Sequence, residues 1–204
     1  MPARHVVLMT MAGVCGFAVA AVAIFAGISR VEQNRGAPAT QIGGPFTLID
    51  DAGVPVTEAA LAGKPSAIYF GYTYCPEICP TTLLDLSRWI AKLGPDADKL
   101  NYVFVSIDPE RDTPQLMHTY LSSFDKHIRG FTGTPEQVAT IAKEYRVYYK
   151  KIPTQDGSYV MDHSSIIYLM AANRKFVSTI AYQENDAAAL AKLRNLLGTT
   201  TPSS

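Results

Sequence analysis

The chain has 204 residues, of which 48% are hydrophobic, and its 18 basic side chains balance its 18 acidic ones. This size and composition suit one globular domain with a short additional segment, and they exclude a fibrous or a disordered chain. A net charge of zero without a dominant basic patch argues against a nucleic-acid-binding protein, so we expect no nucleic acid among its partners.

The amino-terminal end differs from the rest of the chain. Residues 6–28 carry no charged side chain and are long enough to span a bilayer as a helix, so we predict a membrane anchor over residues 1–30. The alternative is a cleaved signal peptide, because Ala21 and Ala23 resemble a cleavage site. No Arg- and Ser-rich transit peptide precedes the span, which favours a bacterial membrane over a mitochondrial one.

A linker is predicted after the anchor. Residues 31–44 are polar and rich in Gly, Pro and Ala, as expected of a flexible connection. We then predict one domain over residues 45–198 and a loose tail at residues 199–204. The domain begins with a predicted β-hairpin whose turn lies at residues 51–53.

The first part of the domain alternates between strands and helices. Apolar runs at residues 66–72 and 101–107 predict two buried strands. Residues 80–93 carry Leu and Ile side chains at helical spacing and predict the helix between these strands. Two further helices are predicted where a threonine cap precedes a proline, over residues 114–124 and 135–145.

The last part of the domain contains a second hairpin. Its predicted strands, residues 147–152 and 158–161, flank a turn that contains Gly157. The remaining predicted elements are two strands and a closing helix, at residues 165–170, 175–181 and 186–197. A strand, a helix and a strand in succession predict a parallel pair, whereas the short turn between the last two strands requires an antiparallel pair. We therefore expect an α/β fold, a mixed sheet with flanking helices.

Two of the three cysteines, Cys75 and Cys79, fall between a buried strand and the following helix. Functional sites gather at this carboxyl edge of an α/β sheet. Pro80 fits the first helical position, which makes Cys79 the helix cap; if the segment is itself helical, the spacing places both sulfurs on one face. Either way the sulfurs lie near a helix N-terminus, which stabilises thiolates.

A stabilising disulfide between Cys75 and Cys79 is the structural interpretation of this pair. A loop closed by so few residues removes little entropy from the unfolded chain, so such a disulfide stabilises weakly. The spacing therefore favours a functional pair, which is either a redox pair or part of a metal site.

A third residue distinguishes these two functions. His163 lies two residues before the strand at residues 165–170, and if this strand runs antiparallel to residues 66–72, His163 faces the cysteines. Two thiolates and an imidazole favour Cu(I), and mixed sulfur–nitrogen sites also hold Zn or Cu(II). Asp108 ends a strand at the same edge and is either an outer residue that tunes the ligands or a turn residue before Pro109.

Three segments of the chain resemble the Sco/SenC family of membrane-anchored copper proteins. They are GYTYCPEICPTT, VSIDPERDTP and DHSSIIYLM, at residues 71–82, 105–114 and 162–170. The resemblance covers about residues 40–198 and implies a thioredoxin-like fold. It also implies one copper ion held by Cys75, Cys79 and His163, whereas thioredoxins have two residues between their cysteines instead of the three found here.

The resemblance implies a role in the assembly of cytochrome c oxidase. The protein is then a copper metallochaperone rather than an enzyme, and its partner is the copper-bearing subunit of the oxidase, whose dinuclear copper site it helps to fill. Periplasmic copper chaperones or thiol reductants are further expected partners. The expected location is the bacterial inner membrane, with a single span and the soluble domain in the periplasm.

Two other functions remain open for the same residues. The first is a thiol–disulfide oxidoreductase that reduces the cysteines of the copper-site target with Cys75 and Cys79, with His163 as an auxiliary proton donor or acceptor. The second is a peroxide-scavenging or redox-sensing protein, which forms sulfenic acid rapidly. The histidine and the spacing of the cysteines favour the copper site.

Overall fold

The computed structural model describes residues 41–198 of the chain. Its strands are β1 (Thr47–Asp50), β2 (Pro55–Thr57), β3 (Ser66–Gly71), β4 (Asn101–Ser106), β5 (Ile128–Thr132), β6 (Tyr149–Pro153), β7 (Tyr159–His163), β8 (Ile166–Met170) and β9 (Phe176–Ala181). Its α-helices are α2 (Ile78–Leu93), α3 (Pro114–Leu121), α4 (Pro135–Glu144) and α5 (Asp186–Gly198). Two 3-10 helices complete the described elements, η1 (Glu58–Leu61) and η2 (Gly94–Lys99).

The main sheet of the described residues has seven strands in the order β2-β1-β5-β4-β3-β8-β9. Strand β4 runs parallel to both β3 and β5, and the other neighbours pair antiparallel. The predicted mixed sheet is therefore confirmed. Strand β3 lies between β4 and β8 and is buried along its whole length, as its continuous apolar sequence requires.

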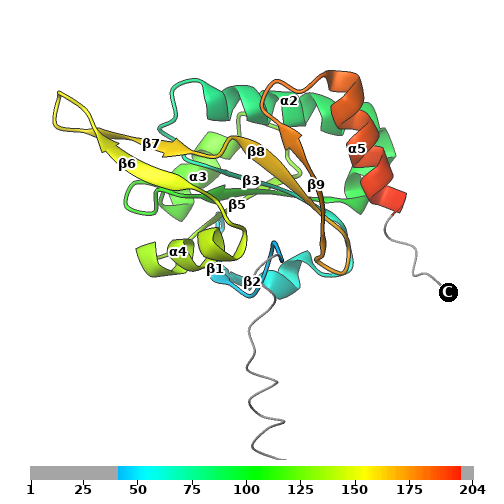
Figure 1. The fold of residues 1–204 in the computed structure, drawn as a ribbon, viewed down its shortest axis with the longest axis horizontal. Coiled ribbons are helices and arrows are strands. Elements are labelled where there is room, and N and C mark those ends of the chain that lie inside the picture. The colour runs from blue at the N-terminus through cyan, green and yellow to red at the C-terminus, as the bar shows by residue number, and fades with distance from the viewer. Residues whose placement is uncertain (1–40, 199–204) are drawn as a thin grey trace, which may run out of the picture. The chain divides into compact units, whose positions relative to one another are not determined.

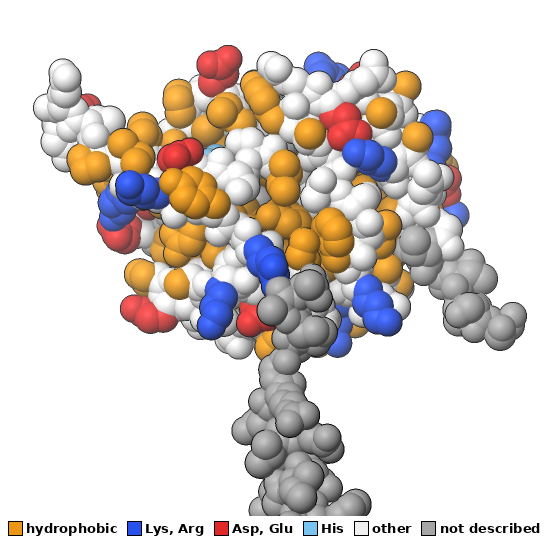
Figure 2. Space-filling view, viewed as in Figure 1, with side chains coloured by type: hydrophobic (Ala, Val, Ile, Leu, Met, Phe, Trp, Pro, Cys, Tyr) orange, Lys and Arg blue, Asp and Glu red, His pale blue; other side chains and the backbone are white. Residues whose placement is uncertain are grey.

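Helices cover both faces of this sheet (Figure 1). Helices α2 and α5 pack together on one face, and α4 lies on the other. Helix α2 buries a stripe of apolar side chains at helical spacing, Leu83, Leu86, Trp89, Ile90 and Leu93. It ends where predicted, because Gly94 takes a positive φ of 59° that favours glycine. On the face shown in Figure 2, acidic and basic side chains are interspersed.

The second predicted hairpin is present as a separate two-stranded sheet of β6 and β7. Its turn lies where predicted, and Gly157 takes a φ of 81° there. The turn end of this inserted hairpin extends away from the main sheet (Figure 1). The hairpin strands pair with each other and with no strand of the main sheet among the described residues.

The structure has one strand that was not predicted and one helix that ends earlier than predicted. Strand β5 was not predicted, because Arg129 and Gly130 interrupt its short apolar pattern; its extended form comes from pairing with β4 and β1. Helix α3 ends at Leu121 instead of Phe124. The hydroxyl of Ser122 bonds to the carbonyl of Thr119 and so satisfies a helix-end acceptor.

The predicted membrane anchor, residues 1–30, lies outside the described residues, as do most of the predicted linker and the predicted tail at 199–204. Among the helices of residues 41–198, none is both long enough and apolar enough to cross a membrane.

Candidate metal centre

Three side chains singled out in the sequence converge at one point of the fold. The sulfurs of Cys75 and Cys79 and a ring nitrogen of His163 lie within 4.8 Å of one another. The Cys79 sulfur is 3.6 Å from Nε2 of His163. Neither cysteine forms a disulfide bond. The three atoms therefore form a soft donor set of two sulfurs and one nitrogen.

Both cysteines come from the junction of β3 and α2. Helix α2 begins at Ile78 with Glu77 as its cap, so the prediction that Cys79 caps the helix is wrong. Pro80 fits inside the first turn because the N–H groups of that turn have no partner within the helix. The N–H of Cys79 donates to the sulfur of Cys75 over 3.3 Å, which places this sulfur at the positive end of the helix.

The imidazole comes from the inserted hairpin. His163 is the last residue of β7, not a residue of the connection before β8 as the sequence suggested. Because β8 runs antiparallel to β3, as expected, the end of the hairpin returns to the edge where β3 ends. Nδ1 of His163 lies 3.1 Å from the carbonyl oxygen of Ser164. A proton donated there leaves the lone pair of Nε2 free, which is the form of imidazole that binds metals.

Strand β3 is shaped to admit the Cys79 sulfur. A Cβ atom at Gly71 would lie 2.8 Å from that sulfur and 2.7 Å from the ring of Phe104. Glycine is therefore the residue that lets α2 approach the sheet this closely. The hydroxyl of Tyr69, also on β3, donates to the Cys79 sulfur over 3.5 Å from a fully buried position.

Cys75, Cys79 and His163 lie within a longer stretch of the chain that matches a known protein family. Residues 34–198 match the family model described as SCO1/SenC. The chain belongs to the SCO1/SenC family. Its mixed sheet and flanking helices are therefore the thioredoxin-like fold of that family.

Two curated relatives and one solved structure illustrate the match. The Arabidopsis thaliana protein SCO1 homolog 1, mitochondrial, is 44% identical over 148 residues, which are 72% of this chain and 44% of that protein. Protein SenC of Rhodobacter capsulatus is 38% identical over 138 residues, 68% of this chain and 62% of that protein. The chain thus spans about half the length of these relatives. A structure of Bradyrhizobium japonicum ScoI with copper bound is 50% identical with a TM-score of 0.72, and covers 76% of this chain and 99% of that one.

The two sulfurs of the candidate metal centre differ in their affinity for a proton. The hydrogen bond from Cys79 lowers the pKa of Cys75 to about 4, with further help from backbone N–H groups. The same hydrogen bond, together with burial and the charge on Cys75, raises the pKa of Cys79. At neutral pH Cys75 is therefore a thiolate, and Cys79 is a thiol that donates to it.

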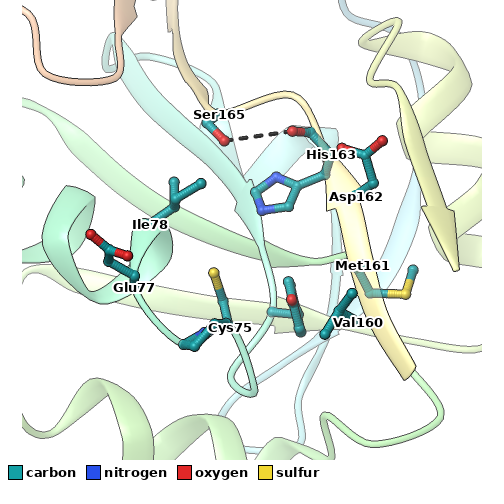
Figure 3. Close-up of a pocket in the computed structure, with 10 residues that line it drawn as sticks. Cys75, Glu77, Ile78, Val160, Met161, Asp162, His163 and Ser165 are labelled. Carbon is teal, nitrogen blue, oxygen red and sulfur yellow. Dashed lines mark hydrogen bonds between the residues drawn. The ribbon is translucent and has the colours of Figure 1, made fainter. Parts of the chain in front are cut away.

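A pocket of about 370 Å³ opens onto the site between α2 and the inserted hairpin. Figure 3 shows the Cys75 sulfur and the His163 ring pointing into it, with Ile78 on one side and Val160 on the other. Cys75 is 9% exposed, whereas Cys79 is completely buried beneath it. An incoming partner therefore meets Cys75 and His163 first.

The remaining candidates lie around this group. Asp108 is buried, and its carboxylate accepts from the hydroxyl of Tyr159 over 2.8 Å and from Nε of Arg111. These contacts join Asp108 to the hairpin rather than to the three donor atoms. Met161 lines the pocket, but its sulfur points away from the His163 ring in Figure 3.

Sequence reasoning missed the roles of Tyr69, Gly71 and Arg111. The first two lie on β3. Tyr69 was interpreted as part of an apolar run, and Gly71 also as the first residue of a family motif, but neither was given a role. A tyrosine hydroxyl in a fully buried strand was the available signal, because a buried hydroxyl needs a partner. Arg111 lies in the motif VSIDPERDTP, and nothing in that local pattern indicates its contacts.

Proposed function

We propose that this protein is a copper metallochaperone that binds one copper ion through Cys75, Cys79 and His163. The observation that carries the proposal is the convergence of these three donor atoms within 4.8 Å. Thiolate sulfur and imidazole nitrogen are the donor types that copper prefers, in either oxidation state. The hydrogen bond from Nδ1 of His163 to the Ser164 carbonyl is the usual outer contact that orients a metal-binding imidazole.

The target follows from the family. We infer that the protein serves the assembly of cytochrome c oxidase and delivers copper to the dinuclear site of its copper-bearing subunit. Membership of the SCO1/SenC family supports this role, as does the copper bound in the Bradyrhizobium japonicum ScoI structure. Periplasmic copper chaperones or thiol reductants are the partners that load the site or keep its cysteines reduced, because an oxidised pair has no thiolates left to bind copper.

The proposed location is the bacterial inner membrane, with residues 1–30 as a single-span anchor and the metal domain in the periplasm. The uncharged run at residues 6–28 supports the anchor. Fractionation of cells, followed by protease treatment of spheroplasts, tests this topology. A domain that stays protected in intact spheroplasts would contradict it.

Copper binding by the reduced full chain in detergent tests the proposed site. Wild type should bind one equivalent of copper and show thiolate-to-Cu(II) charge-transfer absorption. Replacing Cys75 with Ser should abolish tight binding, and His163→Ala should weaken binding and alter the absorption. Cys15→Ser is the matched control, because it removes the third cysteine of the chain and leaves Cys75, Cys79 and His163 unchanged. Native affinity in the Cys75 and His163 variants would refute the proposal.

The difference between the two sulfurs supports a second candidate function, a thiol–disulfide oxidoreductase that reduces its target. The Cys75 thiolate would attack a target disulfide, form a mixed disulfide and release one target thiol. Cys79 would then lose its proton and attack the Cys75 sulfur, which releases the second target thiol and leaves a Cys75–Cys79 disulfide. The pKa of Cys75 at about 4 and its place at the pocket suit the attacking role.

The two functions differ in their dependence on the histidine. In an assay that follows the reduction of a disulfide-linked peptide, the oxidoreductase predicts that His163→Ala retains activity and Cys75→Ser loses it. The chaperone predicts that His163→Ala impairs copper transfer even where thiol exchange is intact. If both variants lose thiol exchange and both still transfer copper normally, the predictions of both functions for His163 are contradicted.

A further inference from the structure

The loop between β4 and α3 contacts both the segment that carries Cys75 and the inserted hairpin that carries His163. Its residue Asp112 is buried and accepts from Oγ1 of Thr73 over 2.6 Å and from the Thr73 N–H over 3.2 Å. Thr73 belongs to the segment that leads to Cys75. The loop is thus attached to the cysteine side of the centre at one end.

Arg111, in the same loop, contacts the cysteine side as well. Its guanidinium carbon lies 4.7 Å from the ring centre of Tyr74 and 5.8 Å from that of Tyr72. These tyrosines precede Cys75, and the Tyr72 ring meets the His163 imidazole edge-on at 5.8 Å. Stacking of a guanidinium on aromatic rings is a favourable contact that lysine does not reproduce.

The other contacts of Arg111 reach the inserted hairpin. Its guanidinium carbon lies 3.7 Å from the ring centre of Tyr159, and Nη1 donates to the Tyr159 carbonyl over 3.0 Å. Asp108 completes the connection, because it accepts from both Arg111 and the Tyr159 hydroxyl. Tyr159 begins β7, the strand that ends at His163.

This arrangement is not that of an ordinary surface arginine. The Arg111 side chain is 19% exposed, and its Nη2 is buried without a hydrogen-bond partner among the described residues. Arg129 offers a comparison, since it also has an aspartate partner, Asp50, and an aromatic neighbour but is 45% exposed. Leaving a guanidinium donor unpaired is unfavourable, so stacking and the contacts to two segments must offset it.

We propose that Arg111 is a positioning residue that holds the inserted hairpin, and with it His163, against the segment that carries Cys75. The proposal rests on the proposed copper site. No strand of the main sheet pairs with β6 or β7 among residues 41–198, so side-chain contacts have to fix the hairpin. Arg111 and Asp108 bond to the first residue of β7, and the other end of that strand presents the imidazole.

The experiment compares Arg111→Ala, His163→Ala and the control Arg129→Ala in the full chain. The first readout is amide hydrogen exchange without copper. In Arg111→Ala, amides of β6 and β7 should exchange faster by at least about tenfold, while those of β3 and β4 keep their protection. The second readout is nitrogen hyperfine coupling in the Cu(II) form. It should be lost in Arg111→Ala as in His163→Ala and retained in Arg129→Ala, with thiolate charge transfer present in all three.

Unchanged hairpin exchange and retained nitrogen coupling in Arg111→Ala would overturn the proposal. Uniform loss of protection that includes β3 and β4 would also overturn it, because Arg111 would then be a general structural residue. If Arg111→Ala does not fold, Tyr159→Phe removes only the bond to Asp108 and should still speed hairpin exchange about twofold to fivefold. Because the exchange measurement uses no copper, its outcome stands even if the chain binds none.

Discussion

The metal centre has a cysteine side, formed by Cys75 and Cys79, and a histidine side, formed by His163. These two sides belong to parts of the fold that differ in burial. The cysteines follow β3, in which every residue is buried, and lie at the start of a long helix packed on the main sheet. His163 ends a hairpin whose strands are mostly half-buried or exposed and which pair only with each other among the described residues. Figure 1 shows this hairpin extending from the body of the fold.

Because of this difference, the sulfurs and the imidazole should contribute to copper binding in different ways. The sulfurs are held by the core, so their geometry should persist as long as the domain is folded. We expect the hairpin that holds the imidazole to open more easily than the core, because few of its side chains are buried. A copper ion that binds all three groups must therefore stabilise the hairpin as well, and a partner that displaces His163 can loosen the copper without unfolding the core.

The largest effect is expected from a change on the cysteine side. Gly71→Ala places a methyl group against both the Cys79 sulfur and the Phe104 ring, and it should lower the free energy of unfolding by about 3 kcal/mol, the upper part of the range for overpacked cores. Chemical denaturation measures this loss. Gly198→Ala is the control, since a Cβ there meets nothing within 4 Å. Equal stability of the two variants would contradict the tight approach of α2.

A matching change on the histidine side should act locally. Met161 is the buried residue of β7, and Met161→Ala should lower the opening free energy of the hairpin by about 2 kcal/mol, the low end for a buried methionine. Hydrogen exchange of β6 and β7 reports this opening, and that of β3 should not change. Val160→Ala, on the exposed face of the same strand, is the control. A Met161→Ala effect spread over both sheets would show that the two sides are one cooperative unit.

A smaller effect is expected from the hydrogen bond to the buried sulfur. Tyr69→Phe removes the donor to Cys79, which should lower stability by about 1 kcal/mol. The thiolate then becomes a stronger electron donor, so the Cu(II) charge-transfer absorption should move to longer wavelength. Tyr120→Phe is the control, because the Tyr120 hydroxyl is buried without a partner in residues 41–198. An unshifted band in Tyr69→Phe would mean that the hydroxyl does not bond to the metal-bound sulfur.

The smallest expected effect is a pH dependence of stability that arises at His127, which is not part of the metal centre. The hydrogen bond to Asp125 is the main cause that raises the pKa of His127, and Asp98 adds to it. This contribution to stability is complete below the ordinary histidine pKa of about 6.5 and is lost as the pH rises through the raised value. The advantage of wild type over His127→Asn should therefore fall by about 0.5 kcal/mol between pH 6 and 9. A difference in thermal stability that stays constant over this pH range would contradict the prediction. The substitution should not change copper binding.

Local signals in the sequence predicted most elements and the three donor residues. Prolines after threonine caps marked the starts of α3 and α4, and the structure has both caps, including a capping box at Thr134. The donor residues could be proposed because strand ends and helix starts meet at one sheet edge. Strand β5 escaped prediction because its partners β1 and β4 come from distant parts of the chain.

The sequence by itself determined the chemistry of this protein: two cysteines at a strand–helix junction, a histidine before a strand, and motifs typical of one family. Only the tertiary structure decided how these groups are held. It placed His163 on a separate hairpin, brought the Tyr69 hydroxyl to Cys79, and set Arg111 between the two sides. The reason is physical: residue type and local spacing determine which donors exist, whereas contacts between distant segments depend on packing that no local pattern records.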